Sequence, residues 1–130
     1  MNYQELYPAL GKLFYAIASS DGKVEKAETL RLKEDLDAIW LPMESSTDLY
    51  GSDAAHSIWF NFELCFDGEW EAADAWAEFL GYYRIHESAF DAELKSRINK
   101  SAAAIAHSFS GFNKAELEYL SKLHLTLNES

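Results

Sequence analysis

The segment 16–32, AIASSDGKVEKAETLRL, constrains the fold most, because it has the pattern of a helix, a tight turn and a second helix. The apolar residues before the turn have helical rather than alternating spacing: Leu6, Leu10, Leu13, Phe14 and Ile17. Gly22 can adopt a positive φ without steric cost and so can end the first helix. Glu25 and Glu28 then fall in the first turn of the second helix, where free N–H groups favour carboxylates.

The same hairpin pattern recurs twice along the chain. Shifted by 88 positions, segment 16–32 aligns with 104–120, AIAHSFSGFNKAELEYL, and eight of the seventeen positions are identical. A shift of 46 aligns the acidic positions 21, 25 and 28 with Asp67, Glu71 and Asp74. These repeats predict an all-α fold: a six-helix bundle of three antiparallel hairpins, with the first and last as pseudo-repeats, in a single domain over 1–130.

Apolar periodicity and helix-breaking residues predict helices over 8–19, 26–39, 54–66, 70–83 and 114–127, with a loop over 41–52. A further helix follows Ser88, which we expect to be its cap, with Asp91 three residues later. Beyond the first helix, the inward faces are predicted to be Ile58, Phe62, Cys65 and Phe66; Trp70, Ala73, Ala77, Leu80 and Tyr83; Phe90, Leu94, Ile98, Ala102, Ile105 and Phe109; and Leu117, Leu120, Leu123 and Leu127.

The charge is −11 and is concentrated in the middle of the chain. No Lys or Arg lies between Lys33 and Arg84, whereas that interval holds twelve acids; the remainder has ten acids and eleven bases. Such a surface repels phosphates, which argues against nucleic acid and anionic membranes as partners. It favours cations or a basic protein partner, and the alternative is a solvated face without a ligand.

Asp21 sits where the predicted first helix ends, among backbone carbonyls that disfavour negative charge. A cation would compensate this charge, and Asp21, Glu25 and Glu28 are hard oxygen donors that suit Ca²⁺ or Mg²⁺, with Zn²⁺ not excluded. Asp67, Glu71 and Asp74 form a weaker second set. The alternative is that Asp21 hydrogen-bonds within the turn, while Glu28 caps the helix and pairs with Lys12 or Lys23. The spacing differs from an EF-hand, whose glycine is the sixth loop residue.

The stretch DGKVEKAE, preceded by an AIA-containing helix and echoed near the C-terminus, resembles the tellurite-resistance TerB-like family. It is also similar to the N-terminal domains of DjlA-type co-chaperones. The resemblance implies a small helical domain in a bacterial stress-response context, with acidic residues that bind metal. Carried onto this chain, it points to Asp21 and Glu28, and less directly to Glu25. Phe109 and Ser110 replace the Asp-Gly pair in the C-terminal copy, which argues against a symmetric second site there.

Catalytic motifs are missing from the sequence. It has no Gly-rich phosphate loop, Cys-x-x-Cys pair or His-Glu-x-x-His stretch, and its four histidines lack ligand spacing. Cys65, in a Leu-Cys-Phe context without a positive neighbour, is predicted to be a buried hydrophobe rather than a nucleophile. We therefore expect a non-enzymatic protein. The absence of a basic leader and of a long apolar run predicts a cytoplasmic location without a membrane span.

Large aromatic side chains are dense between positions 59 and 83. Four of them lie off the predicted inward faces: Trp59, Phe60, Trp76 and Tyr82. One interpretation is that these rings pack on the long loop. The other is an exposed patch for an apolar protein partner or for a second subunit, so that the chain is either a monomer or a homodimer.

Overall fold

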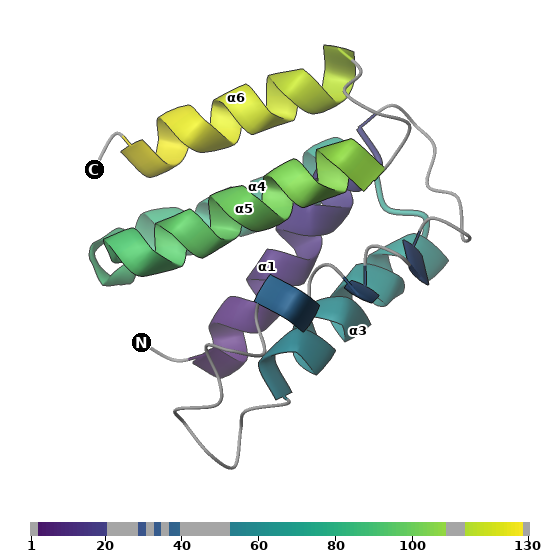
Figure 1. The fold of residues 1–130 in the computed structure, drawn as a ribbon, viewed down its shortest axis with the longest axis horizontal. Helices are drawn as coiled ribbons and strands as arrows, with labels where there is room; N and C mark the ends of the chain where they lie inside the picture. Colours follow the sequence, from purple (N-terminus) through teal and green to yellow (C-terminus); the bar gives the residue numbers. More distant parts are fainter. Residues whose placement is uncertain are drawn as a thin grey trace.

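The computed structural model describes residues 3–20, 29–30, 33–34, 37–39, 53–108 and 114–128. The helices are α1 (Tyr3–Ala18), α3 (Asp53–Asp67), α4 (Ala72–Ile85), the 3₁₀ helix η2 (Glu87–Ala89), α5 (Ala92–Ser108) and α6 (Lys114–Asn128) (Figure 1). These ranges contain no strand, so the all-α prediction is confirmed for them. Residues 29–30, 33–34 and 37–39 are helical too, within the predicted helix 26–39. The predicted loop 41–52 lies outside the described residues.

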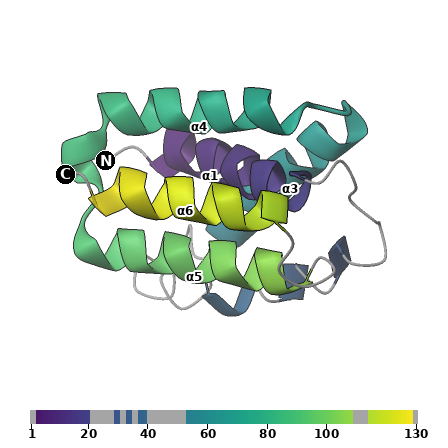
Figure 2. The same ribbon diagram turned by 90° about the horizontal axis from the view of Figure 1, so that it is seen from above.

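Helix α1 occupies the centre of the molecule. It contacts α3, α4, α5 and α6, and Figure 2 shows it between α4 and α5. All five apolar residues predicted for its inward face are fully buried, because each side of this helix has a neighbour. Helices α5 and α6 also pack against each other, whereas α3 and α4 pack mainly on α1.

Aromatic rings fill the interfaces around α1. Between α1 and α3, Phe62 is stacked on Trp59 at 5.0 Å between ring centroids and meets Tyr15 edge-on at 5.7 Å. Beside α5, Tyr83 of α4 meets Phe90 edge-on at 4.8 Å. The buried area of such rings contributes most of the favourable free energy of folding in a domain of this size. No described helix is long and apolar enough to cross a lipid bilayer.

Two predicted helix starts are corrected by the structure. Helix α1 begins at Tyr3 rather than at Pro8, which lies inside it. An interior proline removes one helical hydrogen bond and crowds the preceding turn, a cost that the full burial of Leu6 and Leu10 on either side of it offsets. Helix α5 is capped by Asp91, not Ser88: Asp91 Oδ1 accepts a hydrogen bond from the Leu94 N–H at 2.8 Å.

The predicted inward face of α4 is also corrected. The structure buries Ala75, Phe79 and Tyr83, whereas Ala73 and Ala77 are exposed. The alanine, aromatic and leucine residues of α4 are distributed around all sides of the helix, so two different faces have similar apolar spacing. The predicted and observed faces share the buried Tyr83, but Leu80 of the predicted face is half-buried and Trp70 is 36% exposed. The predicted faces of α3 and α5 are confirmed at Ile58, Phe62, Cys65 and at 90, 94, 98, 102 and 105. Position 109 lies outside the described residues.

Candidate functional site

Asp21, Glu25 and Glu28, the first predicted ligand set, lie outside the described residues, which stop at Ser20 on this side. Two serine hydroxyls cap the carbonyl end of α1 just before them. The Ser19 hydroxyl donates to the Tyr15 carbonyl at 2.7 Å, and the Ser20 hydroxyl donates to the Ile17 carbonyl at 2.8 Å. Both carbonyls also accept a backbone N–H. These two oxygens therefore have partners within the chain and are poor candidates for cation ligands.

The second predicted set, Asp67, Glu71 and Asp74, lies at the connection between α3 and α4, where all three side chains are exposed. Within the described ranges no three His, Cys, Asp or Glu side chains are grouped so as to hold a metal ion. The structure therefore gathers these acids on one surface without forming a coordination site from them. We define the acidic corner as this surface, made by Asp67, Glu69, Trp70, Glu71, Asp74 and Glu78.

The backbone of the acidic corner is a Schellman-type helix end. The Trp70 N–H donates to the Cys65 carbonyl at 3.1 Å, and the Glu69 N–H donates to the Phe66 carbonyl at 3.2 Å. Glu69 has a φ of 51°, so the left-handed residue follows Gly68 rather than being the glycine itself. A Cβ on Gly68 would lie 3.1 Å from the Trp70 ring. Gly68 thus permits the close approach that sets the position of Trp70.

Trp70 is fixed to α1 from two sides. The Tyr15 hydroxyl donates to the Trp70 carbonyl at 2.8 Å. The Lys12 ammonium nitrogen lies 5.6 Å from the centroid of the Trp70 ring and 3.7 Å from the Glu78 carboxylate. The acidic corner thus holds an ammonium group between an indole face and a carboxylate, an arrangement stabilised by cation–π attraction and by charge.

Two open hollows flank Trp70. One, of about 640 Å³, is lined by Tyr15 of α1 and by Ser19, just after α1, together with Asp67, Glu69 and Glu71. The other, of about 570 Å³, is lined by acidic residues and Ala77, the acids being Glu69, Glu71, Asp74 and Glu78. Trp70 lines both hollows and is 36% exposed. The acidic corner can therefore present one aromatic face and several carboxylates to a positively charged group.

Three of the four aromatic residues assigned to a partner surface pack against other rings: Trp59 is buried, and Trp76 and Tyr82 are partly buried. Trp59 is buried on Phe62, with 5.0 Å between the ring centroids. The Trp76 ring lies 5.9 Å from Phe79 and 5.7 Å from Tyr119. The Tyr82 ring lies 4.3 Å from His86 and 6.3 Å from Phe90. Phe60 is 54% exposed, one turn before the equally exposed Leu64. These rings do not form the continuous exposed patch that one interpretation requires.

Cys65 is buried, as predicted. Burial raises the pKa of its thiol above the ordinary value, while the positive charge of Lys12 acts in the opposite direction. The sequence around Cys65 gave no sign of this lysine, which α1 contributes from 53 positions away. A thiol with a raised pKa is protonated at neutral pH and is a poor nucleophile.

The sequence-based interpretation also missed Lys12, Tyr15, Glu69, Trp70 and Glu78 as parts of one site. Their only sequence signal is the stretch Glu69-Trp70-Glu71, in which an indole stands between two carboxylates. Comparison of the chain with protein-family models, with curated proteins and with solved structures gave no match.

Proposed function

We propose that this chain is a non-enzymatic binding domain whose acidic corner accepts a basic segment of a protein partner, with one Lys or Arg side chain on the face of Trp70. The observation that carries the proposal is Lys12. Its ammonium group lies over the Trp70 ring and beside Glu78, so the chain itself contains the ligand chemistry that we assign to the partner.

The charge around Trp70 supports a cationic ligand. Asp67, Glu69, Glu71 and Asp74 are exposed, and their combined field attracts a positive segment from a distance. The aromatic face adds about 0.5–1 kcal/mol at an exposed site. A ligand with several positive side chains would be bound through both the electrostatic attraction and the cation–π contact. An anionic or neutral ligand would be bound through neither.

Isothermal titration with a lysine-rich peptide tests this function, with a glutamine-for-lysine peptide as the ligand control. We expect binding that weakens as salt is added, because the attraction is between charges. Trp70→Leu should weaken it by about two- to fivefold through loss of the cation–π contact. Phe60→Leu, which changes an exposed ring outside the acidic corner, should leave it unchanged. Equal affinity for both peptides, or no effect of Trp70→Leu, would contradict the proposal.

A second candidate function is divalent-cation binding by Asp21, Glu25 and Glu28, as the TerB-like resemblance implies. One structural observation favours it: Ser19, two residues before Asp21, lines the same hollow as Asp67, Glu69 and Glu71. The carboxylates of Asp67, Glu69 and Glu71 are hard oxygen donors of the kind that Ca²⁺ and Mg²⁺ prefer. Under this proposal, the chain is a single TerB-like domain of three hairpins that acts in a bacterial stress response in the cytoplasm.

Thermal unfolding with millimolar Ca²⁺, Mg²⁺, Mn²⁺ or Zn²⁺ tests the second candidate. At a free concentration of about 100 Kd, a bound ion should stabilise the parent by about 2.7 kcal/mol, which raises its Tm. Asp21→Asn should abolish that shift, whereas Asp91→Asn, at the cap of α5, should retain it. An unchanged Tm with all four ions, or an equal shift in Asp21→Asn, would exclude this candidate.

A further inference from the structure

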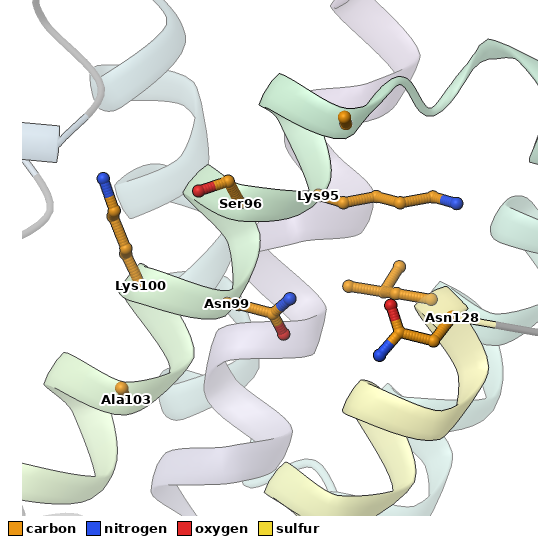
Figure 3. A pocket seen from close by; sticks show the side chains of 8 residues that line it. Lys95, Ser96, Asn99, Lys100, Ala103 and Asn128 are labelled. Carbon is orange, nitrogen blue, oxygen red and sulfur yellow. The ribbon is translucent and has the colours of Figure 1, made fainter.

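A third hollow lies between α5 and α6, at the end of the molecule away from the acidic corner. It measures about 680 Å³, and its lining includes Lys95, Asn99 and Lys100 of α5 and Leu127 and Asn128 of α6. Figure 3 shows the amides of Asn99 and Asn128 turned toward each other across the hollow, with Lys95 extended beside them. We call this surface the basic hollow. It combines ammonium groups, amide donors and apolar carbon, which suits a carboxylate-bearing segment.

The charges of the two surfaces are opposite. Residues 53–85 carry seven acids and one arginine, a net charge of −6, whereas α5 carries three bases and one acid, a net charge of +2. Figures 1 and 2 place the connection between α3 and α4 at one end of the long axis, and the start of α5 with the end of α6 at the other. Helix α5 therefore carries a net positive charge and residues 53–85 a net negative one, although Glu87, Asp91 and Glu93 lie near the start of α5.

We propose that the basic hollow binds the acidic corner of a second copy of this chain, head to tail. This inference rests on the proposed function, because the basic segment is then supplied by α5 of the other copy. The turn 67–71 is exposed at every residue, so it can enter a hollow. Lys95 and Lys100 would meet its carboxylates, while the Asn99 amide would donate a hydrogen bond to them; the Asn128 amide nitrogen is already within 2.9 Å of His124 Nε2.

The symmetry of such an association follows from the two unlike surfaces. Because each copy uses its acidic corner on one neighbour and its basic hollow on the next, the contact is heterologous. It leaves one surface of each kind free at the ends, so the assembly grows with protein concentration unless a ring closes. The contact depends on charge and should therefore weaken at high ionic strength.

Two double variants, each altering one surface, test this inference by sedimentation velocity. Glu71→Lys with Asp74→Lys reverses the corner, and Lys95→Glu with Lys100→Glu reverses the hollow. At about 20 mM salt the parent should form species larger than a monomer, and these should dissociate at about 300 mM. Each double variant alone should be a monomer. An equimolar mixture should associate again, because the intact hollow of one variant meets the intact corner of the other, and the two reversed surfaces also carry opposite charges.

A monomeric parent at low salt, or a mixture that stays monomeric, would overturn the inference. If the parent forms only a dimer, and the mixture of the two variants forms none, the contact is two-fold symmetric. That result would overturn the inference too. Circular dichroism checks folding, and the single variants Glu71→Lys and Lys100→Glu replace any double variant that unfolds. If the parent binds the lysine-rich peptide but never self-associates, only this inference fails. If it binds no basic peptide, the proposed function fails as well.

Discussion

Truncating Phe62 to alanine should lower the free energy of unfolding by about 3–5 kcal/mol, the range for a fully buried phenylalanine. Phe62 has no exposed surface, stacks on Trp59 and meets Tyr15 of α1 edge-on. Removal of the ring leaves a cavity between two helices that α1 cannot close without losing its contacts on the other sides. Urea unfolding followed by circular dichroism measures the loss of stability. An unchanged m-value would show that the variant and the parent expose the same surface on unfolding.

Phe60→Ala is the matched control, because it removes the same ring from the same helix. Phe60 is 54% exposed, and we expect its truncation to change the free energy of unfolding by less than about 0.5 kcal/mol. A large loss for Phe60 together with a small loss for Phe62 would mean that α3 faces α1 with its other side.

Replacing Gly11 by alanine should destabilise the protein by about 1–3 kcal/mol, although alanine is the better helix former. A Cβ at position 11 would lie 2.6 Å from the Ile58 carbonyl oxygen and 2.7 Å from Cβ of Asn61. The first of these is a backbone atom of α3, so relief of the overlap requires the two helices to move apart. That movement would loosen the packing of Phe62 against α1.

Gly81→Ala, in contrast, should raise the free energy of unfolding. Gly81 lies in α4, and a Cβ there would meet nothing within 4 Å. The substitution should therefore stabilise the protein by about 0.5–1 kcal/mol through helix propensity alone. Urea unfolding of both variants gives the comparison. Two changes of the same sign would show that α1 and α3 do not approach as closely at Gly11 as the structure has them.

The sequence predicted best the helix faces on which Leu, Ile and Phe residues recur at helical spacing, although Tyr15 and three alanines on the other sides of α1 are buried as well. The buried faces of α1 and α5 follow directly from spacings of three and four between Leu, Ile and Phe residues. Helix α4 could not be predicted in this way, because its apolar residues surround it and only the neighbours decide which rings are buried. Gly11 appears in the sequence as a weak helix former, since a close approach between two helices leaves no periodic signal.

The candidate site was predictable only in part. The concentration of acids in the middle of the chain was evident from the sequence, and the structure gathers Asp67, Glu71 and Asp74 on one surface. The roles of Lys12 and Tyr15 were not, because these residues lie more than 50 positions from Trp70 and meet it only through the packing of α1. Such contacts depend on tertiary structure, which local patterns do not encode.

The titration of the lysine-rich peptide into Lys12→Met tests most directly whether the Trp70 face is the binding surface. Methionine retains a long apolar stem over the ring but removes the competing ammonium group, and it leaves Glu78 without its partner. We predict that the affinity for the peptide rises by about two- to fivefold, because the partner's ammonium no longer competes with Lys12. An unchanged or lower affinity would contradict the assignment of a cationic ligand to this face.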